Sequence, residues 1–353
     1  MAAHCIALDV HCAFTELAVV DSKGRLVRRE RLSTTIPTLV EALQRISGKR
    51  RLTFEEGPMA DWLARNLREH VDELIVCEPR RNHLIAKDSD KDDPLDAQKQ
   101  AQLLRGGYLK AVHQPSSLER SVFKQHVALY HDRVRQKTRD ANRLMAQFRR
   151  HGVFVRQRQF ADASRRRGLL AQLPRQALLR QDVELLWESY DLAVEQVRTM
   201  RRRLIQRARK EDVIRRFCEV PGIGWIRATT FYVYVDTPWR FRRKAAFWRY
   251  LGIGLERSHS GAGPTKVRVA QNVNHRLRNA ILGAAQKAID HQDNPFFDQY
   301  RRWEDQGLSF RNARRNVARS LAATLWSMWK TGHEYRPELV LRREGCATSD
   351  CVS

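Results

Sequence analysis

The strand-forming segments of this 353-residue chain all fall within its first 77 residues. Runs rich in β-branched and apolar residues, separated by short turns or by helical segments, predict strands at Ile6–Val10, Phe14–Val20, Leu26–Leu32, 52–56 and 74–77. An apolar spacing of three or four residues predicts helices at 36–48, 59–70 and 94–106. The first three strands should form an antiparallel meander. The order β-β-β-α-β-α-β-α predicts an α/β domain over residues 1–112, with a mixed sheet covered by helices on both faces.

Beyond residue 112 the strand signals disappear and helical periodicity takes over. Heptad-like apolar positions run through residues 113–216, and they include Leu118, Val122, Leu129, Leu185, Leu192, Met200 and Leu204. One helix, expected over 177–209, would be roughly 50 Å long at 1.5 Å per residue. We expect this helical middle region to form an antiparallel or intermolecular coiled coil.

The C-terminal third is predicted to be a separate all-α domain over residues 217–335. Its helices are expected at 225–235, 243–251, 275–291 and 309–331. The tail, residues 336–353, loses periodicity, and we expect it to be disordered.

Positive charge is concentrated behind the first domain. Residues 1–130 carry 20 Lys and Arg against 18 Asp and Glu, whereas residues 131–353 carry 45 against 22. The total of +25 exceeds what a solvated surface needs, so a polyanion such as nucleic acid is the expected partner. Two arginine triplets, Arg165, Arg166 and Arg167 and then Arg201, Arg202 and Arg203, are candidate phosphate contacts, although either could be an ordinary solvated face.

Several classes of protein are disfavoured by composition. No run approaches 18 apolar residues, so a transmembrane helix is not expected, and the N-terminus lacks the basic start of a secretory signal. The six cysteines are scattered without CxxC pairs, which indicates reduced thiols and a cytoplasmic protein. The absence of HExxH argues against a zinc hydrolase.

Acidic residues gather at the predicted strand ends and at one helix start. Asp9 ends the first strand, and Glu55 or Glu56 ends the fourth. Asp93 and Asp96 belong to a segment, residues 88–96, that holds five acids in nine residues. Acids this dense repel one another unless a cation lies among them, and oxygen ligands suit Mg²⁺. The simpler interpretation is that acids at a helix start complement the helix dipole.

These residues carry a resemblance to a known family. Ile6-Ala-Leu-Asp-Val-His11, Glu55-Glu-Gly-Pro58 and Lys91-Asp-Asp-Pro-Leu-Asp-Ala97 resemble the N-terminal domain of the DEDD transposases of the insertion-sequence 110 family. Val220-Pro-Gly-Ile-Gly224 and the segment from Tyr250 to Gly261 resemble that family's C-terminal domain. The motifs occur in the family's order across about residues 5–290.

The resemblance implies an RNase H-like (RuvC-like) catalytic domain. It assigns Asp9, Glu55, Asp93 and Asp96 as a metal-binding tetrad, and it selects Glu55 over Glu56 because the family pattern Glu-x-Gly-Pro starts at Glu55. Strand geometry alone leaves this choice open, since neighbouring strand residues face opposite sides.

The resemblance also implies a nucleophilic serine in the C-terminal domain. Ser260 directly precedes Gly261, as the family serine precedes glycine, and Ser258 is the alternative. From the residues alone, a Ser-Gly loop is usually a plain turn. The chain departs from the family at 267–274. Upstream, the turn around Gly222 and Gly224 resembles a helix-hairpin-helix whose amides could bind a phosphate, although it could equally be a helix cap.

The expected function is therefore DNA transposition or site-specific recombination with Mg²⁺ as cofactor. The resemblance implies a bridge-type non-coding RNA that pairs with donor and target DNA. It also implies a homo-oligomer, a dimer or tetramer, in which one subunit supplies the tetrad and another supplies Ser260. The expected location is the bacterial nucleoid, without membrane contact. A second interpretation is a junction-resolving nuclease that uses the same acids and a water nucleophile, and a third is a non-enzymatic RNA-binding scaffold.

Overall fold

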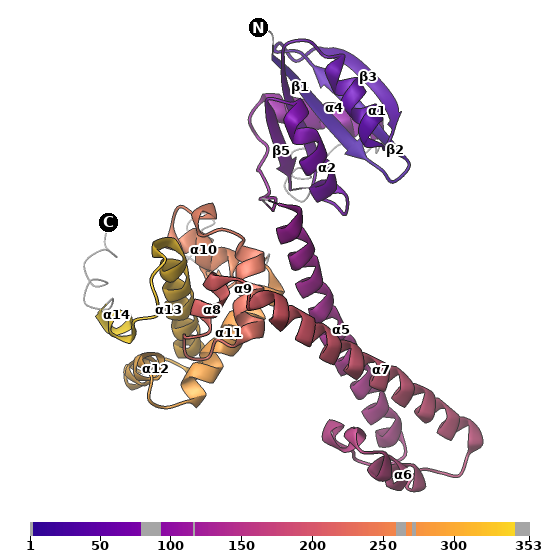
Figure 1. The fold of residues 1–353 in the computed structure, drawn as a ribbon, viewed down its shortest axis with the longest axis vertical. Coiled ribbons are helices and arrows are strands. Elements are labelled where there is room, and N and C mark those ends of the chain that lie inside the picture. The colour runs from indigo at the N-terminus through magenta and orange to yellow at the C-terminus, as the bar shows by residue number, and fades with distance from the viewer. Residues whose placement is uncertain (1–2, 79–92, 116, 259–265, 270–272, 343–353) are drawn as a thin grey trace. The chain divides into compact units, whose positions relative to one another are not determined.

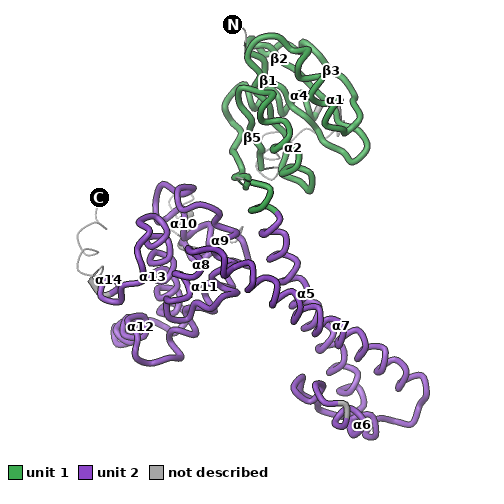
Figure 2. The backbone as a smooth tube through the Cα atoms, in the orientation of Figure 1, with its two compact units in different colours: residues 1–121 green, residues 122–353 purple. Residues whose placement is uncertain are grey.

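The computed structural model describes residues 3–78, 93–115, 117–258, 266–269 and 273–342. The chain divides into two compact units, Met1–Ser121 and Val122–Ser353 (Figure 2). The buried apolar residues of the first unit do not belong to the large cluster of the second. Each unit is therefore described by itself.

The first unit is built on a five-stranded mixed sheet (Figure 1). The strands are β1 (Ala3–Val10), β2 (Phe14–Val20), β3 (Leu26–Ser33), β4 (Lys49–Glu55) and β5 (Glu73–Cys77). Their spatial order is β3-β2-β1-β4-β5, with antiparallel pairs among the first three and parallel pairs at β1–β4 and β4–β5. The central strand β1 is apolar on both faces from Cys5 to Leu8, which is typical of an inner strand.

Helices cover both faces of this sheet. They are α1 (Ile36–Gln44), α2 (Ala60–Leu67) with the 3₁₀ turn η1 (Arg68–His70), and α4 (Asp93–Arg105). Helices α1 and α2 share a core with Ile6 and Leu8 of β1. On the opposite face, Ala101 and Leu104 of α4 share a smaller core with Ala7. Because side chains alternate along a strand, the odd-numbered positions of β1 face α4.

The predicted element order of this unit is confirmed, and the sheet is mixed as expected. Helix α1 ends earlier than predicted, because Gly48 has a positive φ of 80° and turns the chain toward β4. Strand β4 begins earlier than predicted, at Lys49, since its charged first residues pair with Ala3 and His4 of β1.

Two long helices dominate the start of the second unit: α5 (Leu118–Arg150), whose first turn precedes the unit boundary, and α7 (Ala177–Ala208). They lie antiparallel (Figure 1). His126 Nε2 is 3.4 Å from the carbonyl oxygen of Met200, and the rings of Phe148 and Trp187 are 5.8 Å apart. Between them, at their far end, lie the 3₁₀ turn η2 (Gln157–Ala161) and α6 (Ala163–Ala171), where Phe160 completes a small core.

Most of the predicted heptad positions do not lie in the interface between α5 and α7. Leu118, Val122, Leu129, Leu185 and Leu192 are between 49% and 62% exposed, whereas Leu204 is fully buried and Met200 is half-buried. Aromatic residues such as Phe123, Phe148 and Trp187 fill the interface instead. Periodicity identified the helices correctly, but it did not distinguish the face that packs within the chain.

The remainder of the second unit is a bundle of shorter elements. These are α8 (Asp212–Phe217), α9 (Trp225–Val235), η3 (Pro238–Arg240), α10 (Lys244–Tyr250), β6 (Leu255–Ser258), β7 (Lys266–Val269), α11 (His275–Asp290), α12 (Pro295–Asp305), α13 (Phe310–Thr331) and α14 (Pro337–Arg342). Helix α9 has the predicted ends, and α10, α11 and α13 lie within one residue of theirs. They share one large core, in which the α13 residues Val317, Leu321 and Leu325 are completely buried.

Three elements of this bundle differ from the prediction. The antiparallel hairpin β6–β7 lies in a domain expected to be all helical, because its four-residue strands are too short for a period-two pattern to stand out. Helix α12 was not predicted, although Asn294 caps it and Pro295 begins it. Helix α14 lies where disorder was expected from residue 336, because buried Val340 anchors it and accepts a hydrogen bond from Gln299 at 3.1 Å.

Candidate active site and nucleic-acid interface

Two of the predicted carboxylates lie at the ends of neighbouring parallel strands. Asp9 is the next-to-last residue of β1, and Glu55 is the last residue of β4. The register pairs Leu8 with Phe54, so the following position on each strand brings Asp9 beside Glu55. Neighbouring strands are about 4.8 Å apart, and the two carboxylates therefore leave the sheet as close neighbours.

Both of these side chains are on the sheet face that α4 covers. Asp9 alternates with Leu8, which lies on the α1–α2 face, and Glu55 alternates with Phe54 in the same way. Helix α4 packs on β1 and carries the other two predicted acids in its first turn. Asp96 is exposed there, and the side chain of Asp93 lies outside the described part of the structure. Three elements with predicted acids thus meet on one face.

The alternative acid, Glu56, continues the strand by one residue. Its backbone N–H donates to the carbonyl oxygen of Cys77 at 2.8 Å, so the chain is still extended at this point. Alternation then directs the Glu56 side chain to the α1–α2 face, away from Asp9. The geometry therefore favours Glu55 as the partner of Asp9.

The donor set fits a hard divalent cation. Within the described residues no group of three or more His, Cys, Asp and Glu side chains is close enough to hold a metal ion, and the side chain of Asp93 is not among them. Asp9 and Glu55 nevertheless supply carboxylate oxygens from adjacent strand positions, which is the ligand type that Mg²⁺ prefers.

An ion pair between a buried acid and an exposed arginine lies next to Asp9 and was missed in the sequence. Glu16 of β2 is directly opposite Asp9, and Arg31 of β3 is directly opposite Glu16. The Glu16 side chain is only 4% exposed and accepts a hydrogen bond from Arg31 Nε at 2.5 Å. Together with Glu55, these residues form one charged row across four strands. The only sequence signal was a single acid within the apolar alternation of β2.

His11 and Phe14 link two members of this row, Asp9 and Arg31, through a second set of contacts. His11 Nε2 lies 3.2 Å from Asp9 Oδ2, and the His11 ring stacks on Phe14 with centroids 4.6 Å apart. The guanidinium of Arg31 lies over the Phe14 ring, 4.3 Å from its centroid. Arg31 therefore contacts both the buried Glu16 and the aromatic group that supports His11, so it restrains both neighbours of Asp9.

The predicted nucleophile Ser260 lies outside the described residues, together with Gly261. The flanking hairpin is described, and its register pairs Ser258 at the end of β6 with Lys266 at the start of β7. Ser258, the alternative nucleophile, is thus a strand residue at the start of the connection. The role of Ser260 as the nucleophile remains a prediction from the family resemblance.

The two predicted arginine triplets have different surroundings. Arg166 donates two hydrogen bonds of 2.5 Å to Asp191 and lies 5.6 Å from the Trp187 ring centroid, whereas Arg165 and Arg167 are exposed. Arg201, Arg202 and Arg203 are all exposed on α7. The second triplet is therefore open to solvent, while the central residue of the first joins α6 to α7.

The glycine turn is tightly packed on one side. Gly222 has φ +81°, and a Cβ at this position would lie 2.2 Å from the carbonyl oxygen of Ala284 in α11. Gly224 caps the start of α9, is exposed, and has open space where a Cβ would be. Gly222 thus allows the turn to approach α11, and Gly224 is the more accessible of the two for a phosphate.

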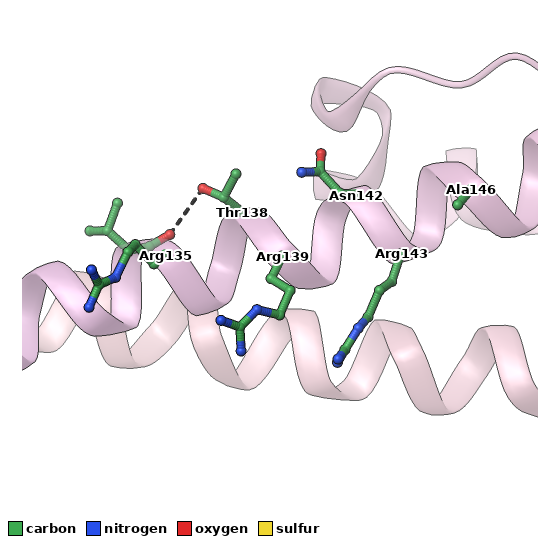
Figure 3. Close-up of a pocket in the computed structure, with 7 residues that line it drawn as sticks. Arg135, Thr138, Arg139, Asn142, Arg143 and Ala146 are labelled. Carbon is green, nitrogen blue, oxygen red and sulfur yellow. Dashed lines mark hydrogen bonds between the residues drawn. The ribbon is translucent and has the colours of Figure 1, made fainter. Parts of the chain in front are cut away.

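A basic strip on α5 was not predicted. Arg135, Arg139 and Arg143 lie one turn apart and line an open pocket of about 590 Å³ (Figure 3). All three are exposed, although Arg135 pairs with Asp132 and Arg143 lies 3.6 Å from Asp140. Their spacing of four residues in the sequence was the available signal.

The fold and the acids define a class of protein. A mixed five-stranded sheet with helices on both faces, and acids at the ends of two parallel inner strands, fits the RNase H-like enzymes that act on nucleic acids. Residues 6–152 match a transposase model of the DEDD, insertion-sequence 110 type, and residues 214–301 match the Transposase IS116/IS110/IS902 family. The chain belongs to the DEDD transposases of the insertion-sequence 110 family.

A curated relative agrees with this assignment. It is named "Putative transposase y4pF/y4sB", from Sinorhizobium fredii (strain NBRC 101917 / NGR234), and is 24% identical over 145 residues. The match spans 40% of this chain and 37% of that protein. Within the residues that the structure describes, no helix has the length and apolar character needed to cross a membrane.

Proposed function

We propose that this protein is the transposase of a mobile DNA element, which cuts DNA and rejoins it at a new site. Family membership supports the DNA-processing class. The observation that carries the proposal is the register of β1 and β4, which brings Asp9 and Glu55 together on the face covered by α4. A purely structural sheet does not need two carboxylates at adjacent strand ends.

Asp9, Glu55, Asp93 and Asp96 would hold Mg²⁺. When bound, the cation would stabilise the negative charge that develops on the phosphate oxygens during cleavage. The protein's own contribution is to fix the acids. Asp9 and Glu55 are held by the strand ladder, while Arg31 holds Glu16 and lies over Phe14, on which His11 stacks beside Asp9.

Ser260 would be the covalent nucleophile. Its oxygen would form a bond to the phosphorus of the DNA backbone, and the bond from phosphorus to one deoxyribose oxygen would break. The serine proton would end on that released oxygen, leaving a sugar hydroxyl. Because the serine ester keeps the phosphodiester energy, rejoining would need no ATP.

The test uses the full-length protein with Mg²⁺, its RNA and labelled DNA. Wild type should form a protein–DNA adduct that survives denaturation, and both Ser260→Ala and Asp9→Asn should form none. If a site takes acids and serine from different subunits, mixing the two variants should partly restore cleavage. Undiminished cleavage by Ser260→Ala without any adduct would contradict the serine mechanism.

That contrary outcome would favour the second candidate, a junction-resolving nuclease. Such an enzyme would use the same acids to activate water and would need no serine. Asp9→Asn should abolish cleavage in both cases, so this variant controls for loss of the metal site. A protein that binds RNA but cuts nothing under any condition would instead be a scaffold.

The exposed leucines support the proposed homo-oligomer. Leu178, Leu185 and Leu192 recur every seven residues along α7 and are 71%, 62% and 61% exposed. A heptad stripe that the chain itself leaves uncovered suits pairing with the same stripe of a second copy. Leu185→Glu should lower the mass measured by light scattering, whereas Glu184→Gln, at an exposed position outside the two seam positions of this heptad, should not.

The proposed guide RNA is supported by the exposed arginines of α5 and α7, which offer phosphate contacts, while the described residues show no evident base-reading element. The direct test is to purify the protein and sequence its bound nucleic acid. A single discrete RNA is expected. A mixture of unrelated fragments would contradict RNA guidance while leaving the DNA-cleavage proposal intact.

A further inference from the structure

Five arginine side chains gather where α11 and α13 pack together. Arg311, Arg315 and Arg319 follow one another at four-residue spacing along α13, Arg314 lies beside them, and Arg278 comes from α11. Arg278, Arg311 and Arg314 all act electrostatically on Arg315, and Arg315 acts on Arg319. The five therefore form one group, the α11–α13 arginine cluster.

This cluster has no acidic counterpart among the described residues that surround it. Residues 306–333 contain no Asp or Glu at all. In the part of the chain that the structure describes, the charged groups that shift the pKa of Arg315 are all arginines. The acceptors are neutral amides: Arg314 donates to Gln286 at 3.0 Å, Arg315 to Asn312 at 3.2 Å and Arg319 to Asn316 at 2.9 Å.

Holding these charges together costs free energy in the unbound protein. Partial burial, followed by the neighbouring guanidinium groups, lowers the pKa of Arg315, and the same causes lower the pKa of Arg319. Arg314 Nε is buried and has no hydrogen-bond partner. The Nε of Arg276 in the same bundle is likewise buried without a partner, but the charge of Arg276 is matched by Asp132 at 3.0 Å. An anionic ligand would supply the charge that the cluster lacks.

The cluster also contacts the base of the β6–β7 hairpin. Arg319 Nε donates to the carbonyl oxygen of Ile253 at 2.9 Å. Arg278 packs against Gly252, and a Cβ added at Gly252 would lie 3.1 Å from the Cδ of Arg278. Residues 252–254 lead directly into β6, which ends two residues before Ser260 in the chain.

We propose that the α11–α13 arginine cluster binds the phosphate backbone of the DNA strand that is to be cut. This rests on the proposed function, because it is Ser260 that makes DNA the expected ligand at this hairpin. Guanidinium groups bind phosphate oxygens through paired hydrogen bonds, and several on one face can follow successive phosphates. Arg319 and Arg278 connect the bound strand to the hairpin backbone.

The experiment compares two double variants of the full-length protein. Arg311→Gln with Arg315→Gln removes two charges from the cluster. Arg215→Gln with Arg301→Gln removes two charges from the same unit, at arginines paired with Asp212 and Glu304. Binding to a short DNA duplex is measured over a range of salt concentrations. The cluster variant should lose about two units of slope of log K against log salt, at ~0.9 per phosphate contact, and the control should keep the wild-type slope.

Three outcomes would overturn the proposal. They are an unchanged slope in the cluster variant, an equal loss in both double variants, and a loss seen with RNA of equal length but not with DNA. Thermal melting separates binding from folding, because removing mutually repelling charges should not lower the melting temperature. The adduct assay separates this proposal from the proposed function. Adducts formed by the wild type, together with an unchanged salt slope in the cluster variant, contradict only the cluster. A reduced slope in the cluster variant, together with no adduct from the wild type, contradicts only the serine.

Discussion

Arg166 and Arg315 both lie in arginine-rich helical segments, yet their surroundings differ. Arg166 on α6 donates two hydrogen bonds to Asp191 and lies over Trp187. Among the described residues, the charged groups that lower the pKa of Arg315 on α13 are arginines, and its hydrogen-bond acceptor is Asn312. The comparison teaches that a basic run in a sequence can be internal structure or an unfilled anion site, and that carboxylate partners decide which.

The largest expected effect lies at His131, a half-buried neighbour of a paired arginine. Arg276 is paired with Asp132, yet burial, then Arg276, lowers the pKa of His131 to about 4. Since the folded pKa lies below the unfolded value near 6.5, this contribution to stability is present above pH 6.5 and is lost as pH falls toward 4. The loss should reach about 3 kcal/mol.

Urea denaturation at several pH values between 7 and 4 measures this effect. His131→Gln should reduce the dependence on pH in this window, because glutamine does not titrate. Identical pH profiles for wild type and variant would show that His131 titrates normally in the folded protein.

The next effect concerns the paired arginine beside the acids. Arg31→Ala would leave the buried carboxylate of Glu16 without its partner, which should cost about 2 kcal/mol because Arg31 itself is largely exposed. Cleavage should also fall, roughly tenfold, because His11 and Asp9 lose support. Chemical denaturation and a cleavage assay measure the two quantities. Arg31→Lys should recover part of each, and wild-type stability in Arg31→Ala would contradict a structural ion pair.

A smaller loss of stability is expected when Arg166, the arginine with a carboxylate partner, is replaced. Arg166→Ala removes the bonds to Asp191 and the contact with Trp187, and we expect a loss of about 1 kcal/mol because Asp191 is half exposed. DNA affinity should change little. Denaturation and duplex binding are measured side by side, and a clear loss of affinity with unchanged stability would make Arg166 a phosphate contact after all.

The smallest effect on stability is expected when Arg315, which has no carboxylate partner among the described residues, is replaced. Arg315→Gln should leave stability unchanged or raise it by roughly 0.5 kcal/mol, because it relieves repulsion between like charges. Thermal melting without nucleic acid measures this. A drop of more than about 1 kcal/mol would show that Arg315 stabilises the fold, and the contrast with Arg166 would then disappear.

The first unit could be predicted well because its information is local. Periods of two and of three to four residues separate strands from helices. Strand ends predicted Asp9 and left Glu55 or Glu56 open, and the family resemblance selected Glu55. The Glu16–Arg31 pair was not predictable, since it depends on the register between β2 and β3. The partner of Arg166 lies 25 residues away, and Arg278 joins the four α13 arginines of the cluster only because α11 packs on α13. These features require tertiary structure, which local patterns do not contain.

The parallel ladder between β1 and β4 has a consequence for how this gene can change. Replacing one apolar residue of β1 by another alters packing slightly. Deleting a single residue before Asp9 would shift the pairing by one position and turn Asp9 to the opposite side of the sheet from Glu55. Homologous active proteins should therefore tolerate many substitutions in these strands, while length changes should be confined to the turns that join them.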